Sequence, residues 1–159
     1  MELIVAEADP QGEAALRLLA LAAAEARSLY PELQVVRASR PSNEPTPPRG
    51  AYFVASLGGH PVGMAAHRPI DEKTTELRRM FVEAGTRRRG VGSILLTAVE
   101  EHARKEGFST VRLETGNRQG PAISWYESAG DRRIPPFGVH VNDPTSVCYE
   151  RLLSHEHVA

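Results

Sequence analysis

Apolar and polar residues alternate along several short stretches of the chain, and this period of two predicts β-strands. The run from Ala51 to Ile70 is interrupted by Gly58-Gly59, a pair typical of a tight hairpin turn, so two antiparallel strands are expected there. The complete set of predicted strands is residues 2–6, the hairpin 51–70, 74–82, 109–115 and 145–153.

Other segments repeat apolar residues every three or four positions, as one face of a helix requires. The clearest stripe begins at Val91, and Gly107 is expected to end that helix. An alanine-rich helix is predicted to run to about Tyr30, with Asp9 as its N-cap and Pro10 at its first position. A short helix is also predicted from "PAISWYESAG", which ends in a glycine.

The order of these elements predicts a mixed α/β or α+β sheet domain. A length of 159 residues suits one domain, so the range 1–159 is assigned to it. The proline-rich stretch 37–50 is expected to be an irregular loop at the edge of a site, not a linker.

Charge and cysteine content narrow the class of protein. The chain has 19 Lys and Arg against 20 Asp and Glu, a formal net charge of -1, which disfavours a general nucleic-acid-binding surface. The one cysteine, Cys148, excludes an internal disulfide framework and fits the cytoplasm. The sequence shows neither a signal peptide nor the roughly 20 consecutive apolar residues that a membrane span needs, so no membrane association is expected.

The segment TRRRGVGSILL, residues 86–96, places three arginines and two glycines directly before a helical stripe. A helix N-terminus leaves backbone N–H groups without internal partners and carries partial positive charge, so it favours an anion. Glycines let a ligand approach the backbone, and arginines donate forked hydrogen bonds to phosphate. The pattern predicts a cradle for a phosphorylated ligand; a solvated arginine run before a glycine-rich helix start is the alternative.

Two common nucleotide-binding loops do not fit this segment. Gly85 and Gly90 have the spacing that begins a Walker A loop, but Val91-Gly92 stands where Lys-Ser/Thr is required. The dinucleotide pattern G-x-G-x-x-G also fails, because Leu95 occupies its last glycine position. A nucleotide triphosphatase or a dinucleotide-binding domain is therefore not expected.

The strand expected at 74–82 carries charges on both faces. Regular alternation would place Glu76, Arg78, Met80 and Val82 on one face and Leu77, Arg79 and Phe81 on the other. In a central strand such charges need a wet cavity or ionic partners, which would make this strand part of a site. On an edge strand, charged residues on both faces would be solvated and would not indicate a site.

Together these stretches resemble the Gcn5-related N-acetyltransferase (GNAT) family. The run RRRGVG, residues 87–92, is similar to the Q/R-x-x-G-x-G/A loop with which that family holds the pyrophosphate of acetyl-coenzyme A (acetyl-CoA). ELRRMFV before it and VRLETGNRQGPAISWYESAG after it look like the family's central strand, next strand and next helix. The tail IPPFGVHVNDPTSVCYE is similar to a bacterial subgroup with a PPFG…DP.S ending, and LYPEL adds a weaker likeness.

The resemblance covers about residues 51–152 and implies a mixed, mostly antiparallel sheet flanked by helices, with acetyl-CoA as cosubstrate and no metal. By this resemblance Met80 and Val82, with Phe81 between them, would lie along the pantetheine arm. Asn117 would bind pantetheine or nearby backbone, or is only a turn residue. The residues implied for the pyrophosphate are Arg87, Arg88, Arg89, Gly90, Val91, Gly92 and Ser93.

The implied chemistry needs a base and an acid. A primary alkylamine with a pKa of ~10.4 is mostly protonated at neutral pH, so a base must act before nitrogen attacks the thioester. Glu76 is the candidate base, through water; a salt bridge to Arg78 or Arg79 is its alternative role. Tyr126 is the candidate acid for the departing thiolate, against the alternative of a half-buried aromatic. Cys148 is expected to be a core residue, which favours direct transfer over an acyl-enzyme.

The predicted function is transfer of the acetyl group of acetyl-CoA to an amine of a small molecule or a peptide, directly in a ternary complex. A non-catalytic acyl-CoA sensor or partner module is the alternative, and a phosphate-binding protein unrelated to coenzyme A is a third. A homodimer is also expected. Two residues depart from the family pattern: Asp131 stands in place of Gly-Phe and removes an apolar anchor, and His140 stands in place of a tyrosine.

Overall fold

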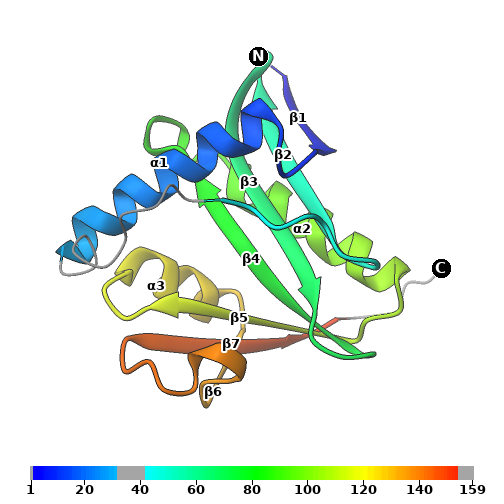
Figure 1. Cartoon of the computed structure of the whole chain (residues 1–159), viewed down its shortest axis with the longest axis vertical. Coiled ribbons are helices and arrows are strands. Elements are labelled where there is room, and N and C mark those ends of the chain that lie inside the picture. Colours follow the sequence, from blue (N-terminus) through cyan, green and yellow to red (C-terminus); the bar gives the residue numbers. More distant parts are fainter. Residues whose placement is uncertain (1, 32–41, 154–159) are drawn as a thin grey trace.

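A seven-stranded sheet forms the centre of the molecule, in the order β1-β2-β3-β4-β5-β7-β6 (Figure 1). The structure is a computed structural model that describes residues 2–31 and 42–153. β4 and β5 are parallel, and the other neighbouring strands pair antiparallel. The strands are β1 (Leu3–Glu7), β2 (Ala51–Leu57), β3 (His60–Pro69), β4 (Thr74–Val82), β5 (Thr110–Gly116), β6 (Arg132–Ile134) and β7 (Ser146–Leu152).

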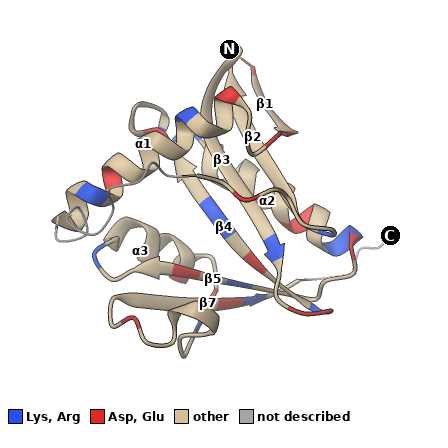
Figure 2. Cartoon of the chain, viewed as in Figure 1, with Lys and Arg blue, Asp and Glu red and all other residues tan. Residues whose placement is uncertain are grey.

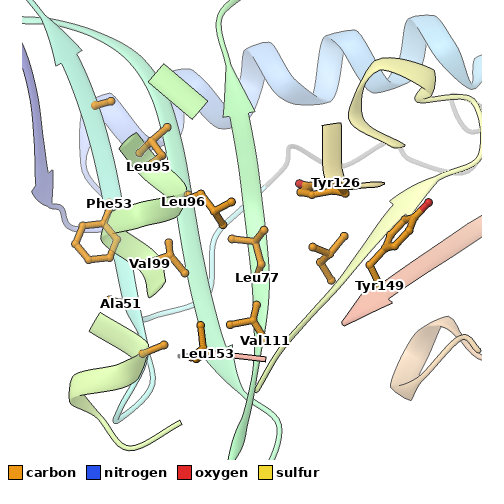
Figure 3. Close-up of a cluster of buried hydrophobic side chains, with 14 of the residues drawn as sticks. Ala51, Phe53, Leu77, Leu95, Leu96, Val99, Val111, Tyr126, Tyr149 and Leu153 are labelled. Carbon is orange, nitrogen blue, oxygen red and sulfur yellow. The ribbon is translucent and has the colours of Figure 1, made fainter. Parts of the chain in front are cut away.

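Three α-helices cover the two faces of this sheet. The face that packs against α1 (Glu13–Leu29), here called the α1 face, includes the buried side chains of Tyr52 and Met64. The opposite α2 face packs against α2 (Val91–Lys105) and α3 (Gly120–Ser128), and its core includes Leu77 (Figure 3). Short 3-10 turns precede α2 (η2, Ala84–Thr86) and β7 (η3, Gly138–His140). The predicted mixed, mostly antiparallel sheet flanked by helices is therefore confirmed.

Most predicted elements are confirmed, and the start of α1 is corrected. Gly12, not Asp9, is the N-cap of α1. The Asp9 carboxylate accepts the backbone N–H of Gln11 at 2.9 Å, so it forms a local turn that competes with helix formation. Pro10 lies in this turn ahead of the helix.

The additional short elements β6, η2 and η3 did not appear in the prediction. Residues 42–50 of the predicted loop contain neither helix nor strand, whereas 37–41 lie outside the described residues.

A β-bulge in β4 overturns the regular alternation expected beyond Arg78. The register with β3 shifts at this point, and Arg79 has a left-handed backbone with φ of 59°. One extra residue moves each following side chain to the other face. Phe81 consequently packs with the α1-face cluster, while Met80 and Val82 pack with the α2-face cluster.

The parallel pairing of β4 with β5 ends early, at Leu77 opposite Leu113. Beyond this point β5 continues beside β7 as far as Gly116, and β4 continues to Val82 beside β3. The two strands diverge, and the gap between them is visible in Figure 1. Within residues 2–31 and 42–153, one backbone edge of β4 therefore has no neighbouring strand along its second half.

Ion pairs replace the apolar anchor that Asp131 was expected to remove. Asp131 is buried, and its Oδ1 accepts a hydrogen bond from Arg151 Nε at 2.5 Å. Arg151 also donates to Glu100 Oε2 at 2.5 Å. This network joins the end of α3, β7 and α2 by charge, so the loss of one partner would leave an uncompensated buried charge.

A buried histidine makes a second polar contact between the sheet and α2. His67, 1% exposed, places Nδ1 at 2.8 Å from Thr75 Oγ1 and Nε2 at 2.9 Å from His102 Nδ1. Burial, and secondarily the neighbouring His102, lower the pKa of His67 to about 4. His67 is therefore neutral in the folded protein at neutral pH.

The low pKa of His67 predicts a loss of stability at acidic pH. An unfolded histidine has a pKa of about 6.5, so below that pH the unfolded chain takes up a proton that the folded chain takes up only near pH 4. We expect the free energy of unfolding to fall by about 2 kcal/mol between pH 7 and pH 5 through this residue. Urea denaturation at a series of pH values between 5 and 7 measures this change in the free energy of unfolding. His67→Gln should flatten the profile, and the exposed His60→Gln should not; an unchanged slope in His67→Gln would contradict the prediction.

Candidate active site

The gap between β4 and β5 is bordered by segments far apart in sequence. The loop before α2, α3 and the end of α1 lie around it (Figure 1), and η3 reaches β4 through the contact of His140 with Glu76. Acidic and basic positions gather where β4, β5 and β7 come together (Figure 2). Along the chain, β4 leads through η2 and the arginine-rich loop directly into the start of α2, so the charged strand and the loop adjoin each other.

The N-terminus of α2 has the backbone geometry of an anion cradle. Gly90 is its N-cap with a left-handed φ of 82°, and Arg88 is also left-handed with φ of 67°. No side chain of the described residues caps this end. The Ile94 N–H makes a helical hydrogen bond to Gly90 O, so the amides of Val91, Gly92 and Ser93 are those that precede the regular helical bonding. Such amides favour a phosphate oxygen.

The three arginines of this loop differ in surroundings. Arg87 donates to Val82 O at 2.8 Å and to Glu25 of α1 at 2.6 Å, so its guanidinium ties the loop to α1. Arg89 lines a surface hollow beside Leu3, on the β1 side of the helix start. Arg88 is exposed, and the described residues include no ion-pair partner for it. Arg88 and Arg89 are both exposed and make no ion pair within the described part of the chain, whereas Arg87 is paired with Glu25.

Met80 and Trp125 form a wall beside the start of α2. A Cβ added to Gly92 would lie 3.5 Å from Met80 Cε and 3.5 Å from Trp125 Cη2. Glycine at this position therefore leaves space between the helix start and the two side chains. Trp125 belongs to α3, so this wall joins α3 to the start of α2. Phe81 faces the α1 cluster, so only its backbone belongs to the cleft.

Asn117 lies at the far end of β5, where its backbone N–H donates to Thr145 O at 2.8 Å. Its side chain is exposed, which fits both the predicted ligand role and a turn residue. Next to it, Arg118 N–H donates to Tyr30 Oη at 2.9 Å. Tyr30, from the weakly matching LYPEL segment, thereby fastens the end of α1 to this turn.

Glu76 lies on the α1 face in contact with His140 of η3. His140 Nε2 is 3.1 Å from Glu76 Oε2, and His140 Nδ1 is 4.0 Å from Glu114 Oε1. Glu114 in turn accepts a hydrogen bond from Ser146 Oγ at 2.7 Å. The sequence suggests Arg78 or Arg79 as the ionic partner of Glu76. In the structure, His140 lies next to the Glu76 carboxylate instead. The sequence feature that could have indicated this contact is the histidine at position 140, where the family pattern has a tyrosine.

Tyr126 is buried on the α2 face, with its ring 6.2 Å from that of Tyr149. Figure 3 shows its hydroxyl directed towards β4, away from that of Tyr149. Burial, and then the Asp131 carboxylate, raise the pKa of the Tyr126 hydroxyl far above its ordinary value. Tyr126 therefore keeps its proton at neutral pH, as a hydrogen-bond donor must.

Cys148 is buried on β7. Burial is the main reason that the pKa of its thiol is raised, and a protonated thiol is a poor nucleophile. The expectation that Cys148 is a core residue is confirmed. Among the described residues, no group of three His, Cys, Asp or Glu side chains is arranged to hold a metal ion.

Comparison with known proteins identifies the family. Residues 15–130 match the model of the acetyltransferase (GNAT) family, and the chain belongs to that family. It is 34% identical over 97 residues to N-acetyltransferase family 8 member 2 of Rattus norvegicus, covering 58% of this chain and 43% of that protein. It is 36% identical over 104 residues to the IAA acetyltransferase of Azospirillum brasilense, covering 64% of this chain and 67% of that one.

A solved structure from Klebsiella pneumoniae subsp. pneumoniae, described as an acyl-CoA N-acyltransferase, shares the fold with a TM-score of 0.77. The two are 27% identical, over 96% of this chain and 98% of that one. The chain spans less than half of the rat relative's length. In the part of the chain that the structure describes, no helix combines the length and apolar character needed to cross a membrane.

The cradle predicts a binding defect from one added side chain. Gly92→Val would place a branched side chain between the helix start and the wall of Met80 and Trp125, where the ligand must approach the amides. We expect coenzyme A affinity to fall by roughly 10- to 150-fold, the value of one charge-assisted hydrogen bond, in isothermal titration calorimetry. Gly85→Val is the matched control, because its Cβ would meet nothing within 4 Å. Equal affinities of the two variants would contradict the cradle.

Proposed function

We propose that this chain transfers the acetyl group of acetyl-CoA to an amine by direct attack in a ternary complex. The observation that carries the proposal is the continuity of the free β4 edge with the N-terminus of α2. An extended arm with a pyrophosphate at one end fits this combination, because the strand edge offers backbone groups in a row and the helix start favours the anion. Membership of the acetyltransferase family supports the thioester as the reacting group.

Each part of the cleft has a role in this proposal. The amides of Val91, Gly92 and Ser93 hold the pyrophosphate, with the positive charge of Arg88 beside them. The backbone of Met80–Val82 lies along the pantetheine arm, and Asn117 binds the arm from the β5 side. Bound acetyl-CoA supplies the activated acetyl group; the chain holds it in line with the acceptor and lowers the entropic cost of their encounter.

Two side chains handle protons in the proposed reaction. Glu76 takes a proton from the ammonium group of the acceptor through water, and His140 holds the Glu76 carboxylate in position at 3.1 Å. The nitrogen lone pair then attacks the thioester carbon and forms the carbon–nitrogen bond, the carbon–sulfur bond breaks, and the nitrogen releases its second proton to water to give the amide. Tyr126 donates a hydrogen bond or a proton to the departing sulfur. An acyl-CoA sensor would need the cradle but neither of these two groups.

The base assignment predicts a pH-dependent defect. Glu76→Gln should lower kcat/KM at pH 7 by roughly 10²-fold or more and regain part of the loss above pH 9, where more of the amine is already neutral. The rate of free-thiol release from acetyl-CoA, followed across a panel of amines, measures both the loss at pH 7 and its recovery above pH 9. The control is Glu150→Gln, which removes a carboxylate on the same face that pairs with Arg112 at 3.0 Å. If both variants lose activity without rescue at high pH, Glu76 has a structural role only.

The acid assignment predicts a separation of binding from turnover. Tyr126→Phe removes only the hydroxyl, so coenzyme A affinity should stay within about twofold while kcat falls by roughly 10²–10⁴. Because the pKa of Tyr126 is raised, the wild-type kcat should not decline between pH 8 and pH 10 through its ionisation.

Tyr149→Phe is the matched control for Tyr126→Phe. It removes a hydroxyl that donates to Glu127 at 2.6 Å, and it should reduce stability by about 1 kcal/mol without lowering kcat. A wild-type rate in Tyr126→Phe would overturn the acid assignment. Coenzyme A binding with no acetylation of any amine by the wild type would favour the sensor.

Four further assignments belong to the same proposal. We place the protein in the cytoplasm because its one cysteine is free and buried. We assign residues 1–159 to a single domain and expect a homodimer, which light scattering tests. We also assign the chain to the subgroup with the PPFG…DP.S tail; that tail lies beyond residue 130, where the family match ends.

A further inference from the structure

Two arginines of β4 lie side by side on the α1 face because of the bulge. In a regular strand Arg78 and Arg79 would point to opposite faces. The register shift at Arg79 instead brings both to the α1 face, where both line one small cavity. Arg79 is committed, because it donates to Asn43 Oδ1 at 2.8 Å and to Ser42 O at 3.2 Å. Arg78 has no hydrogen-bond or ion-pair partner in the described ranges 2–31 and 42–153.

The cavity beside these arginines has a volume of about 50 Å³, on the order of one or two water molecules. Arg68 and Glu44 also line it, and they form an ion pair at 2.6 Å. Three arginines and one glutamate therefore line this cavity. The space suits a small polar group such as a carboxylate and is too small for a ring.

The electrostatics of the cavity favour an added negative charge. Burial, and after it the positive charge of Arg78, lower the pKa of Arg79, so the two cations repel each other in a partly buried place. The carboxylate of Glu44 is already paired with Arg68. An anion that bound Arg78 would relieve this repulsion and would receive forked, charge-assisted hydrogen bonds.

The cavity adjoins the proposed base. Glu76 is two residues before Arg78 on the same face, about 7 Å away along the strand, and it lies opposite Arg68 in the β3–β4 register. His140 and Glu114 lie on the other side of Glu76, towards β5. An acceptor whose amine lies at Glu76 thus meets carboxylates on the β5 side, Arg68 on the β3 side and Arg78 further along β4. The cation and the anion of such an acceptor would be separated by only a few bonds.

We propose that the acceptor is an amine that carries a carboxylate a few bonds from its nitrogen, as amino acids do, with Arg78 as the residue that binds the carboxylate. This inference rests on the proposed acetyltransferase function and narrows its substrate class. Polyamines and simple alkylamines present no anion to Arg78 and would place a further cation near it. They are therefore poor acceptors.

Matched pairs of amines with and without the carboxylate test the proposal. Free-thiol release would compare phenylalanine with phenethylamine and lysine with cadaverine, and phosphoethanolamine with ethanolamine would show whether phosphate serves as well. The wild type should prefer the carboxylated member by roughly 10- to 150-fold in kcat/KM, the range for one charge-assisted hydrogen bond. A phosphate preference without a carboxylate preference would overturn the carboxylate assignment.

Variants of Arg78 locate the effect. Arg78→Met should abolish the preference and raise the KM for the carboxylated amine, while the KM for acetyl-CoA stays unchanged. Arg78→Lys should keep part of the preference for the carboxylated amine, because lysine retains the positive charge but lacks the paired N–H donors of the guanidinium group. Arg27→Met, on the exposed last turn of α1, is the charge-matched control and should behave as the wild type. A preference unchanged in Arg78→Met, or a raised KM for acetyl-CoA, would overturn the assignment.

Calorimetry separates this inference from the proposed function. Phenylalanine titrated into protein saturated with coenzyme A should bind the wild type and the Arg27→Met variant, and should bind Arg78→Met at least tenfold more weakly. This binding requires no turnover. If acetylation occurs but phenethylamine is used as well as phenylalanine, the carboxylate site is wrong and the acetyltransferase stands. If phenylalanine binds through Arg78 but no amine is acetylated, the proposed function is wrong and the carboxylate site stands.

Discussion

The early end of the β4–β5 pairing is the constraint on which the site depends. After Leu77 and Leu113 the two strands take different partners, and a length of β4 backbone is left facing a gap. Buried backbone groups need hydrogen-bond partners, so this edge is a place where an extended ligand can take the position of a missing strand. The start of α2 lies at the end of that edge. The backbone edge of β4 and the unbonded amides at the start of α2 are therefore neighbours in the fold.

The bulge at Arg79 makes the two faces of β4 chemically different. It directs Met80 and Val82 to the α2 face and keeps Arg78, Arg79 and Phe81 on the α1 face. Apolar side chains thereby lie on the α2 face of the strand, and the two arginines lie on the α1 face. A regular strand with the same sequence would mix the two sets, with an arginine directed into the core cluster.

The sequence was informative where local periodicity decides structure. The hairpin at Gly58-Gly59, the strand 74–82 and the helix from Val91 all followed from alternation, turn residues and helical spacing. The bulge did not, because it arises from pairing with β3 and has no glycine to mark it. The contact of Glu76 with His140 spans 64 positions of sequence, so no local pattern could reveal it.

Where a residue departs from a known pattern, sequence alone shows that something is lost but not what replaces it. Asp131 was read as a missing apolar anchor, yet Arg151 and Glu100 supply an ionic one. The same limit applied to Asp9, whose cap-like sequence context was overridden by a local turn. In both cases the outcome depends on partners that only the folded chain brings near.

The hydrogen bond between Tyr30 and Arg118 has a consequence for how the cleft moves. It fastens the last turn of α1 to the turn that carries Asn117, and Arg118 also donates to Leu29 O at 2.8 Å. A Cβ on Gly116 would lie 2.0 Å from Tyr30 Oη, so the two segments are also in steric contact. A movement of the last turn of α1 away from the turn that carries Asn117 would therefore have to break both hydrogen bonds.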